Sequence, residues 1–290
     1  MQQHINKLIN NNKALPSEVP IQHEFGKYKQ PKLMKPQQLT HELHSSSTII
    51  ESYVNGCPVD CGTPWTRDHI IAALKRGAHP SAKQPDARQC LIKETMSKVN
   101  EGYAKLVKWK DIKNNLPKQF KLSPVAMIPH KSRAYRCILD LSFQLKYKGQ
   151  LMPSVNSSTI KLAPQKAMSQ LGSCINRTIH TMATNYDPSN PFFFSKLDIK
   201  DGYWRMLVSE EDAWNFCYVL PPESKESPLG KYQIVIPASL QMGWCESPPF
   251  FCAATETACD IIHYLHTTTS TLPTHQLEHH LLPSQHYQPS

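Results

Sequence analysis

The strand expected over Phe192–Ile199 carries the residues with the clearest capacity for chemistry. Asp198 lies near its end, and a second carboxylate, Asp201, follows three residues later. A carboxylate at a strand end is held rigidly and can face open space, which suits a divalent metal ion that bridges nucleotide phosphates. Asp201 and Gly202 also fit an Asp-Gly turn that closes a strand. This segment alone favours the turn over metal binding, and both interpretations stay open.

A basic hairpin is expected upstream of this strand. Its polar link carries Lys131 and Arg133, and Arg136 begins the second β-rich run. Ammonium and guanidinium groups at a hairpin tip can grip a triphosphate through charge-assisted hydrogen bonds. The plainer interpretation is a basic loop on a solvated surface.

A Gly-Trp segment, Gln241–Phe251, leads into the strongest helical pattern of the chain. Gly243 permits close approach of another part of the chain, and Trp244 offers a flat apolar wall. Ser247 and Pro248 suit the N-cap and the first turn of a helix. The plainer interpretation is a loop that feeds a capped helix.

Periodicity and capping residues predict the elements that position these segments. The expected helices are Thr66–Arg76, Ala87–Lys105, Lys166–Leu171 and Ser247–Leu265. The apolar stripe of the second helix comprises Ile92, Met96, Val99 and Tyr103. The expected strands are Pro124–Ile128, Arg136–Leu141, Phe192–Ile199, Trp214–Leu220 and Tyr232–Ile236.

Positive charge is concentrated in the first half of the chain. Residues 1–150 hold 24 Lys and Arg against 11 Asp and Glu, whereas residues 151–290 hold 8 against 12. The densest stretch, Lys105–Lys148, has 11 basic residues and two acids. Such asymmetry favours a surface that follows a phosphate backbone over a merely solvated basic face.

Together and in this order, the three segments resemble the fingers and early palm of reverse transcriptases, especially those of long-terminal-repeat and related retroelements. In the family's aspartate motif, Leu-Asp is followed by Gly or Ala and an aromatic residue, as in Leu197–Tyr203. Its hairpin has Arg, an apolar pair, Asp and Leu, which Arg136–Leu141 resembles. Its later segment joins Gly to Ser-Pro and Phe, as Gly243–Phe251 does. The resemblance covers about residues 87–265.

The resemblance implies RNA-directed DNA synthesis with Mg²⁺ and deoxynucleoside triphosphates on an RNA or DNA template-primer. Asp198 would be the catalytic carboxylate that binds the metal, and the backbone carbonyl of Ile199 would help to hold it. Tyr203 would crowd the sugar 2′ position and favour deoxynucleotides. The nucleotide-binding residues that the resemblance implies are Lys131, Arg133, Arg136, Asp201, Gly202, Tyr203, Gln241, Met242 and Gly243.

One departure from the family bears directly on activity. The family places two adjacent aspartates on a hairpin downstream of the Ser-Pro helix, and this chain has no adjacent pair. Two metal ions must stabilise the attacking and the leaving oxygen in this reaction. We therefore expect the chain to be inactive by itself. A second departure is Met242, where many family members have Gln or Phe.

The expected fold is α+β. A fingers-like region over 63–180 and a partial palm with an antiparallel sheet over 181–265 lie between a disordered polar leader, 1–62, and a disordered tail, 266–290. Nine scattered cysteines without a signal peptide fit reduced thiols in an intracellular protein, cytoplasmic or nuclear. No apolar run approaches the roughly 20 residues that span a bilayer, so no membrane partner is expected.

Three alternatives stay open. Cys57 and Cys61 have a spacing that could bind zinc, and His263/His266 and His275/His279 are further candidates, although structural zinc needs four ligands close in space. The basic half could bind nucleic acid without catalysis, which would make the binding salt-sensitive. The chain could also lack a stable fold, because the helix after Ser247 has no later palm strands to cover it.

Overall fold

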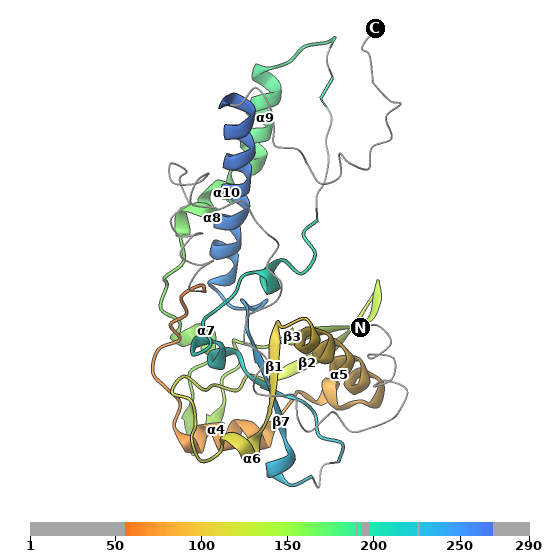
Figure 1. Cartoon of the computed structure of the whole chain (residues 1–290), viewed down its shortest axis with the longest axis vertical. Coiled ribbons are helices and arrows are strands. Elements are labelled where there is room, and N and C mark those ends of the chain that lie inside the picture. The colour runs from red at the N-terminus through yellow and green to blue at the C-terminus, as the bar shows by residue number, and fades with distance from the viewer. Residues whose placement is uncertain (1–55, 190, 193–197, 225–226, 269–290) are drawn as a thin grey trace.

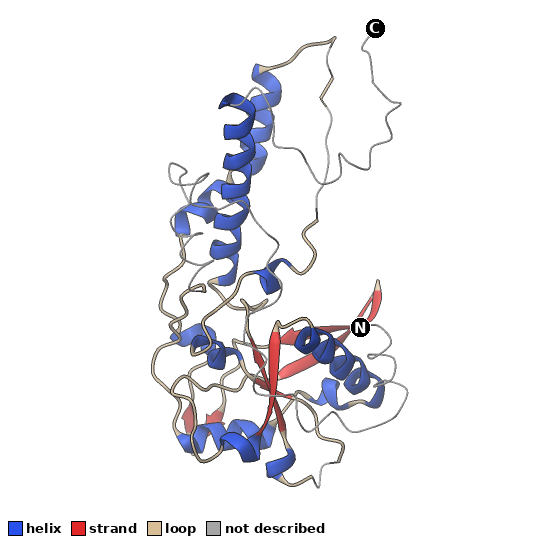
Figure 2. Ribbon diagram, in the orientation of Figure 1, coloured by secondary structure: helices blue, strands red, loops and turns tan. Residues whose placement is uncertain are grey.

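The computed structural model describes residues 56–189, 191–192, 198–224 and 227–268 (Figure 1). Within these residues the protein combines helices with small antiparallel sheets, as the sequence predicts (Figure 2). Most of the expected leader and tail, and the centre of the expected strand Phe192–Ile199, lie outside the described residues. None of the described helices is long and apolar enough to cross a membrane.

A three-stranded antiparallel sheet forms the centre of the fold. Its order is β1 (Ala104–Lys108), β7 (Gln233–Pro237) and β6 (Tyr218–Val219), with Leu106 opposite Val235. The central strand β7 holds a run of buried aliphatic residues, as a strand covered on both faces should. The expected strand Tyr232–Ile236 is thereby confirmed.

Two hairpins accompany this sheet. β2 (Val125–His130) pairs antiparallel with β3 (Arg133–Leu139), which confirms the predicted basic hairpin. The short strands β4 (Lys146–Tyr147) and β5 (Gln150–Leu151) form the second hairpin.

The helices gather at both ends of the molecule. In Figures 1 and 2, α8, α9 and α10 lie together at one end, and α4, α5 and α6 lie beside the strands at the other. Their bounds are α4 Arg67–Arg76, α5 Pro85–Asn100, α6 Trp109–Ile112, α7 Val155–Ser158, α8 Gln165–Gly172, α9 Cys174–Thr184 and α10 Ser247–Thr268. The 3-10 helices are η1 Pro80–Lys83, η2 Gly202–Arg205, η3 Asp212–Phe216 and η4 Leu229–Lys231.

Helix α5 ends earlier than its apolar pattern predicts. The helix stops at Asn100, and Gly102 adopts a left-handed conformation with φ +82°. The amide of Tyr103 then donates to the carbonyl of Lys98 at 2.9 Å, which turns the chain into β1. The buried face is also rotated from the expected stripe, and comprises Ala87, Leu91, Thr95, Lys98 and Val99.

Two further expectations are corrected. The segment Trp214–Leu220 begins with the end of the 3-10 helix η3, which stops at Phe216, and only Tyr218–Val219 forms a named strand. The last residues of the expected leader pack into the core, because Cys57, Val59 and Cys61 are buried and the amide of Cys57 donates to the Leu207 carbonyl. Alternating buried residues there mark an extended segment, which the Pro-rich composition concealed.

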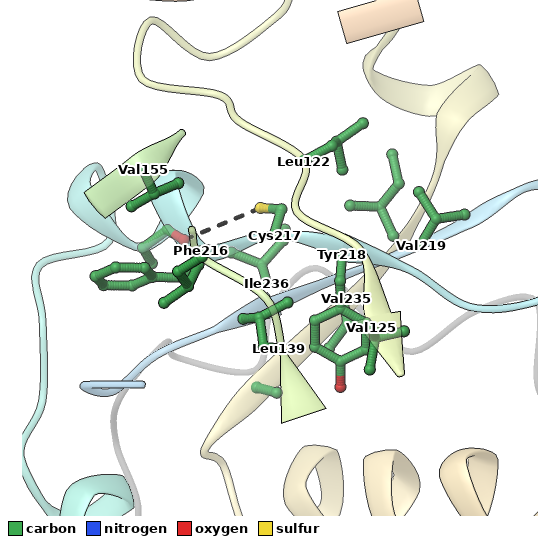
Figure 3. Packing of buried hydrophobic residues seen from close by; sticks show 14 of the residues in the cluster. Leu122, Val125, Leu139, Val155, Phe216, Cys217, Tyr218, Val219, Val235 and Ile236 are labelled. Atoms are coloured by element: carbon green, nitrogen blue, oxygen red, sulfur yellow. Dashed lines mark hydrogen bonds between the residues drawn. The ribbon is translucent and has the colours of Figure 1, made fainter. Parts of the chain in front are cut away.

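The main core joins the first hairpin to the central sheet. Figure 3 shows Val125 and Leu139 of the hairpin in one cluster with Val235 and Ile236 of β7 and with Tyr218 of β6. The Tyr218 hydroxyl lies 3.1 Å from the Thr95 hydroxyl of α5, and its burial raises the pKa of the phenol. The hairpin, the sheet and α5 are therefore one packed unit.

Among the side chains that the structure describes, a second and smaller buried cluster lies between α8 and α10 and comprises Ala167, Cys252 and Ala253. Ile175 and Ile179 on α9 stay 69% and 60% exposed. Stability should therefore reside in the sheet-containing core.

Replacing a core residue should show this division. Ile234→Ala in β7 removes a fully buried side chain and should lower the free energy of unfolding by about 2–5 kcal/mol. Ile175→Ala is the matched control and should change it by less than about 0.5 kcal/mol. Urea unfolding followed by circular dichroism measures both, and equal losses would contradict the assigned core.

Candidate functional site

The basic hairpin and the Gly-Trp turn are in direct contact. The Arg136 guanidinium donates through Nη2 to the thioether Sδ of Met242 at 3.0 Å. Gly243 has φ +98°, and a Cβ built there would lie 3.3 Å from the Leu139 carbonyl oxygen. The turn therefore needs glycine both for its backbone conformation and for its approach to β3.

Two polar side chains form hydrogen bonds with this turn, on the side away from the hairpin. Asn156 of α7 donates through Nδ2 to the Gly243 carbonyl at 2.8 Å and accepts from the Cys245 amide at 3.0 Å. Thr159 accepts a hydrogen bond from Trp244 Nε1 at 3.0 Å. Sequence reasoning missed both residues, because their polar neighbourhood suits an exposed loop equally well.

The side chains of the turn alternate between core and solvent. Gln241 is buried and donates through Nε2 to the carbonyls of Ser239 and Leu240 at 2.8 and 3.2 Å. Met242 is 57% exposed. Of these two predicted nucleotide-binding residues, Met242 is therefore on the surface beside Arg136, whereas the side chain of Gln241 is in the core.

Trp244 does not form an open wall, contrary to expectation. It is 2% exposed, stacks against Phe250 and meets Phe216 edge to face with ring centroids 5.2 Å apart. A large aromatic side chain stabilises most when it is removed from water, and this one anchors the turn in the core.

A buried carboxylate joins the start of α10 to the start of α8. Glu246 is 2% exposed, and its Oε2 accepts from the amides of Leu162 and Ala163, each at 2.8 Å. Its Oε1 accepts from Gln165 Nε2 at 3.2 Å. Hydrogen bonds from these three donors compensate for the water that the Glu246 carboxylate loses on burial. We therefore assign Glu246 a structural role.

The aspartate segment lies at the edge of the described residues. Asp198 and Ile199 are exposed and belong to no strand, and residues 193–197 before them are not described. The side chain of Asp198 is thus on the surface rather than in the core. The expected strand receives no support from the residues that can be described.

The following residues pack firmly against α10. Asp201 has φ 56°, a left-handed conformation that Asp tolerates, and it begins η2. A Cβ on Gly202 would lie 2.8 Å from the Phe251 ring, so only glycine fits without a shift of that ring. Tyr203 meets the same ring edge to face at 5.3 Å. The aspartate segment therefore contacts the helix that the Gly-Trp turn begins.

Lys98 of α5 neutralises Asp201. Its Nζ lies 3.0 Å from Asp201 Oδ2, and the lysine side chain is only 11% exposed. The same ammonium group lies 5.3 Å from the Tyr103 ring centroid and 5.2 Å from that of Trp204. The sequence shows no sign of this role, because Lys98 lies beside the predicted apolar stripe of its helix.

The basic stretch Lys105–Lys148 is not one continuous charged surface. Lys121 is fully buried, donates to the Cys61 carbonyl, and burial lowers its pKa. Lys105 and Lys148 form ion pairs with Glu210 and Asp68. The expected groove wall therefore loses Lys121, and the charges of Lys105 and Lys148 lie beside carboxylates.

Exposed cations nevertheless remain at the hairpin. Lys131 is exposed at its tip, and Arg136 is half-buried beside Met242. Arg133 begins β3. Of the predicted nucleotide residues, Arg136 of the hairpin and Met242 and Gly243 of the Gly-Trp turn are thus brought together. Gly202 and Tyr203 pack instead against Phe251 of α10, and Asp201 pairs with Lys98 of α5.

The donor set does not fit a two-metal centre. Among the described residues, no group of three or more His, Cys, Asp or Glu side chains could hold a metal ion. Asp201 is already paired with Lys98, which leaves Asp198 as the one carboxylate of the motif without a described ion pair. A single carboxylate is too little for two Mg²⁺ ions.

The zinc alternative finds no support either. Cys57 and Cys61 are both buried, and burial raises the pKa of the Cys61 thiol to about 11. A zinc ligand must be a thiolate, which this environment disfavours. The side chains of His263 and His266, and all of His275 and His279, lie outside the described residues.

Comparison with known proteins adds no relative. No protein-family model and no curated protein matches the chain.

The ion pair of Lys98 and Asp201 should couple α5 to the aspartate segment. A double-mutant cycle with Lys98→Met and Asp201→Asn should give a coupling energy of about 1–2 kcal/mol in urea unfolding, because the pair is largely shielded from water. The matched control is Lys148 with Asp68, whose side chains are 69% and 62% exposed. Its coupling should stay below about 0.5 kcal/mol. Equal coupling in the two cycles would contradict the assigned role of Lys98.

Proposed function

We propose that the chain is a reverse-transcriptase-type fragment, with polymerase-like fingers and a partial palm, that binds nucleic acid and deoxynucleoside triphosphates and does not catalyse by itself. The observation that carries this proposal is the meeting of the three motifs on residues 241–251. The hairpin reaches this segment through Arg136 and Met242, and the aspartate motif reaches it through Gly202 and Phe251. This proximity of three segments that lie far apart along the chain is what supports the proposal.

The proposed site gives separate parts of a nucleotide separate partners. Lys131 and Arg136 supply positive charge for the phosphates, and the planar guanidinium suits two phosphate oxygens at once. Tyr203 packs edge to face against Phe251, and the proposal assigns to this ring the role of restricting the sugar. Mg²⁺, in a complete enzyme of this class, would stabilise charge on the phosphates. The carboxylates described here do not fit that role, and no catalytic step is assigned to them.

A second candidate is a non-catalytic nucleic-acid binder. It is favoured by the exposed lysines Lys110, Lys113 and Lys118 after β1, which add charge beyond the hairpin. Its partners would be the backbone phosphates of RNA or DNA, without preference among bases. In either case the nine free cysteines fit a reducing compartment, the cytoplasm or the nucleus.

Catalysis should be absent from the purified chain. In a primer-extension assay with Mg²⁺ and all four deoxynucleoside triphosphates, we expect no product, because one carboxylate cannot hold both metal ions. Gel electrophoresis of a labelled primer is the measurement. Clear extension that Asp198→Asn abolishes would show that the chain is an active polymerase.

Binding to nucleic acid should depend strongly on salt. The affinity for a fluorescent RNA–DNA hybrid should fall steeply between about 50 and 200 mM NaCl, because each neutralised phosphate releases counterions. Arg136→Ala and Lys131→Ala should each reduce the slope of log K against log salt by about 1. Lys75→Ala, an exposed lysine at the end of α4, is the matched control and should leave the slope unchanged. Salt-independent binding would rule out a phosphate-binding surface.

A further inference from the structure

Met242 is the most exposed of the described methionines. It is 57% exposed, whereas Met168 is 36% and Met127 is 1% exposed. The other described methionines, Met96, Met152, Met182 and Met206, are half-buried. Thioether oxidation follows exposure to the oxidant. We propose that Met242 is a site of reversible oxidation by peroxides, and that its sulfoxide captures the guanidinium of Arg136.

The contact between these two side chains makes the oxidation consequential. Arg136 Nη2 lies 3.0 Å from Met242 Sδ, and a thioether sulfur is only a weak acceptor. Oxygen adds to the sulfur lone pair that faces solvent, and rotation of the exposed side chain about its last bonds then brings this polar oxygen to the neighbouring guanidinium. The resulting bond is charge-assisted, so that Arg136 becomes more firmly engaged.

The fold prevents the Met242 side chain from moving away from Arg136 into the core after oxidation. Its neighbours Gln241 and Trp244 already occupy the core, at 5% and 2% exposure. Asn156 holds the backbone on both sides of the turn, at the Gly243 carbonyl and the Cys245 amide. The side chain at position 242 is therefore kept on the surface beside Arg136.

Arg136 lies on an apolar face of the hairpin, where a new hydrogen-bond acceptor would add a polar contact. In the hairpin register Arg136 lies opposite Ile128, and Ile138 is two residues further along the same face of β3. Ile128 and Ile138 are 46% and 37% exposed and offer no polar group to the guanidinium. An oxygen on Met242 would add one at the edge of this apolar face.

The chemical step is balanced with a peroxide as the oxidant. A lone pair of Met242 Sδ attacks one peroxide oxygen, a sulfur–oxygen bond forms and the oxygen–oxygen bond breaks. The sulfur loses two electrons, and the peroxide is reduced to water or to an alcohol. Reduction of the sulfoxide by a thiol-dependent methionine sulfoxide reductase restores the thioether.

The regulatory meaning of this switch rests on the proposed function. Arg136 is one of the cations assigned to the phosphates, and a guanidinium bound to the sulfoxide oxygen is less available to them. Oxidation should therefore weaken triphosphate binding. The capture of Arg136 is a property of the protein alone and can be tested without any nucleotide.

The first experiment measures where oxygen enters. The full chain is treated with limiting hydrogen peroxide, and peptide mass spectrometry follows each methionine. Met242 should oxidise about tenfold faster than Met127, with Met168 between them, because reactivity follows exposure. Oxidation of Met242 no faster than that of Met127 would overturn the proposal.

The second experiment measures the state of Arg136. Phenylglyoxal labels free guanidinium groups, and oxidation of the chain should slow the labelling of Arg136 about fivefold, the effect of one charge-assisted hydrogen bond. Met242→Gln carries a permanent amide oxygen near the same place and should show slow labelling without peroxide. Met242→Leu should label at one rate with and without peroxide. The matched control is Arg67, whose labelling should stay constant in every sample.

The outcomes separate this proposal from the proposed function. If Met242 carries oxygen and Arg136 labels as before, the capture of Arg136 is wrong. If labelling slows but the untreated chain binds no deoxynucleoside triphosphate in equilibrium dialysis, the switch stands and the proposed function fails. If both hold, the triphosphate affinity should fall on oxidation in the parent chain and stay constant in Met242→Leu.

Discussion

The turn at Gly243 and Trp244 is the constraint on which the candidate site depends. Its glycine lies against the Leu139 carbonyl of the hairpin, and its backbone is bonded on the opposite side by Asn156. The buried indole of Trp244 leaves the turn no freedom to leave the core. Backbone hydrogen bonds and aromatic burial thereby hold Met242 beside Arg136, while the hairpin itself is positioned by its packing in the main core.

Charge compensation distinguishes the carboxylates that build the structure from the one that remains available. Glu246 is satisfied by three donors and Asp201 by the ammonium group of Lys98. Both are therefore committed within the protein, since removing either partner would leave a shielded charge without compensation. Of these three carboxylates, Asp198 is the exposed one, and no ion pair is described for it.

Local signals in the sequence were sufficient for the elements with strong periodicity or caps. The helix capped by Thr66 and ended by Gly77, the basic hairpin, and the helix beginning at Ser247 are all confirmed. Sequence reasoning failed where tertiary contacts decide, as at Trp214–Leu220, where the chain forms a 3-10 helix before a very short strand. Short β-rich runs are ambiguous, because burial rather than propensity selects their conformation.

The partners of the site residues were harder to predict than the site residues themselves. Lys98 and Asn156 act on residues about 90 to 100 positions away along the chain, at Asp201 and Gly243. Spacing and composition do not predict contacts between residues so far apart along the chain, because the tertiary packing brings these segments together. A motif therefore predicts which groups are chemically suitable, and only the fold determines which of them are free. By that criterion Asp201, which was expected to line the nucleotide pocket, is engaged by Lys98, and Met242 is the exposed side chain in contact with Arg136.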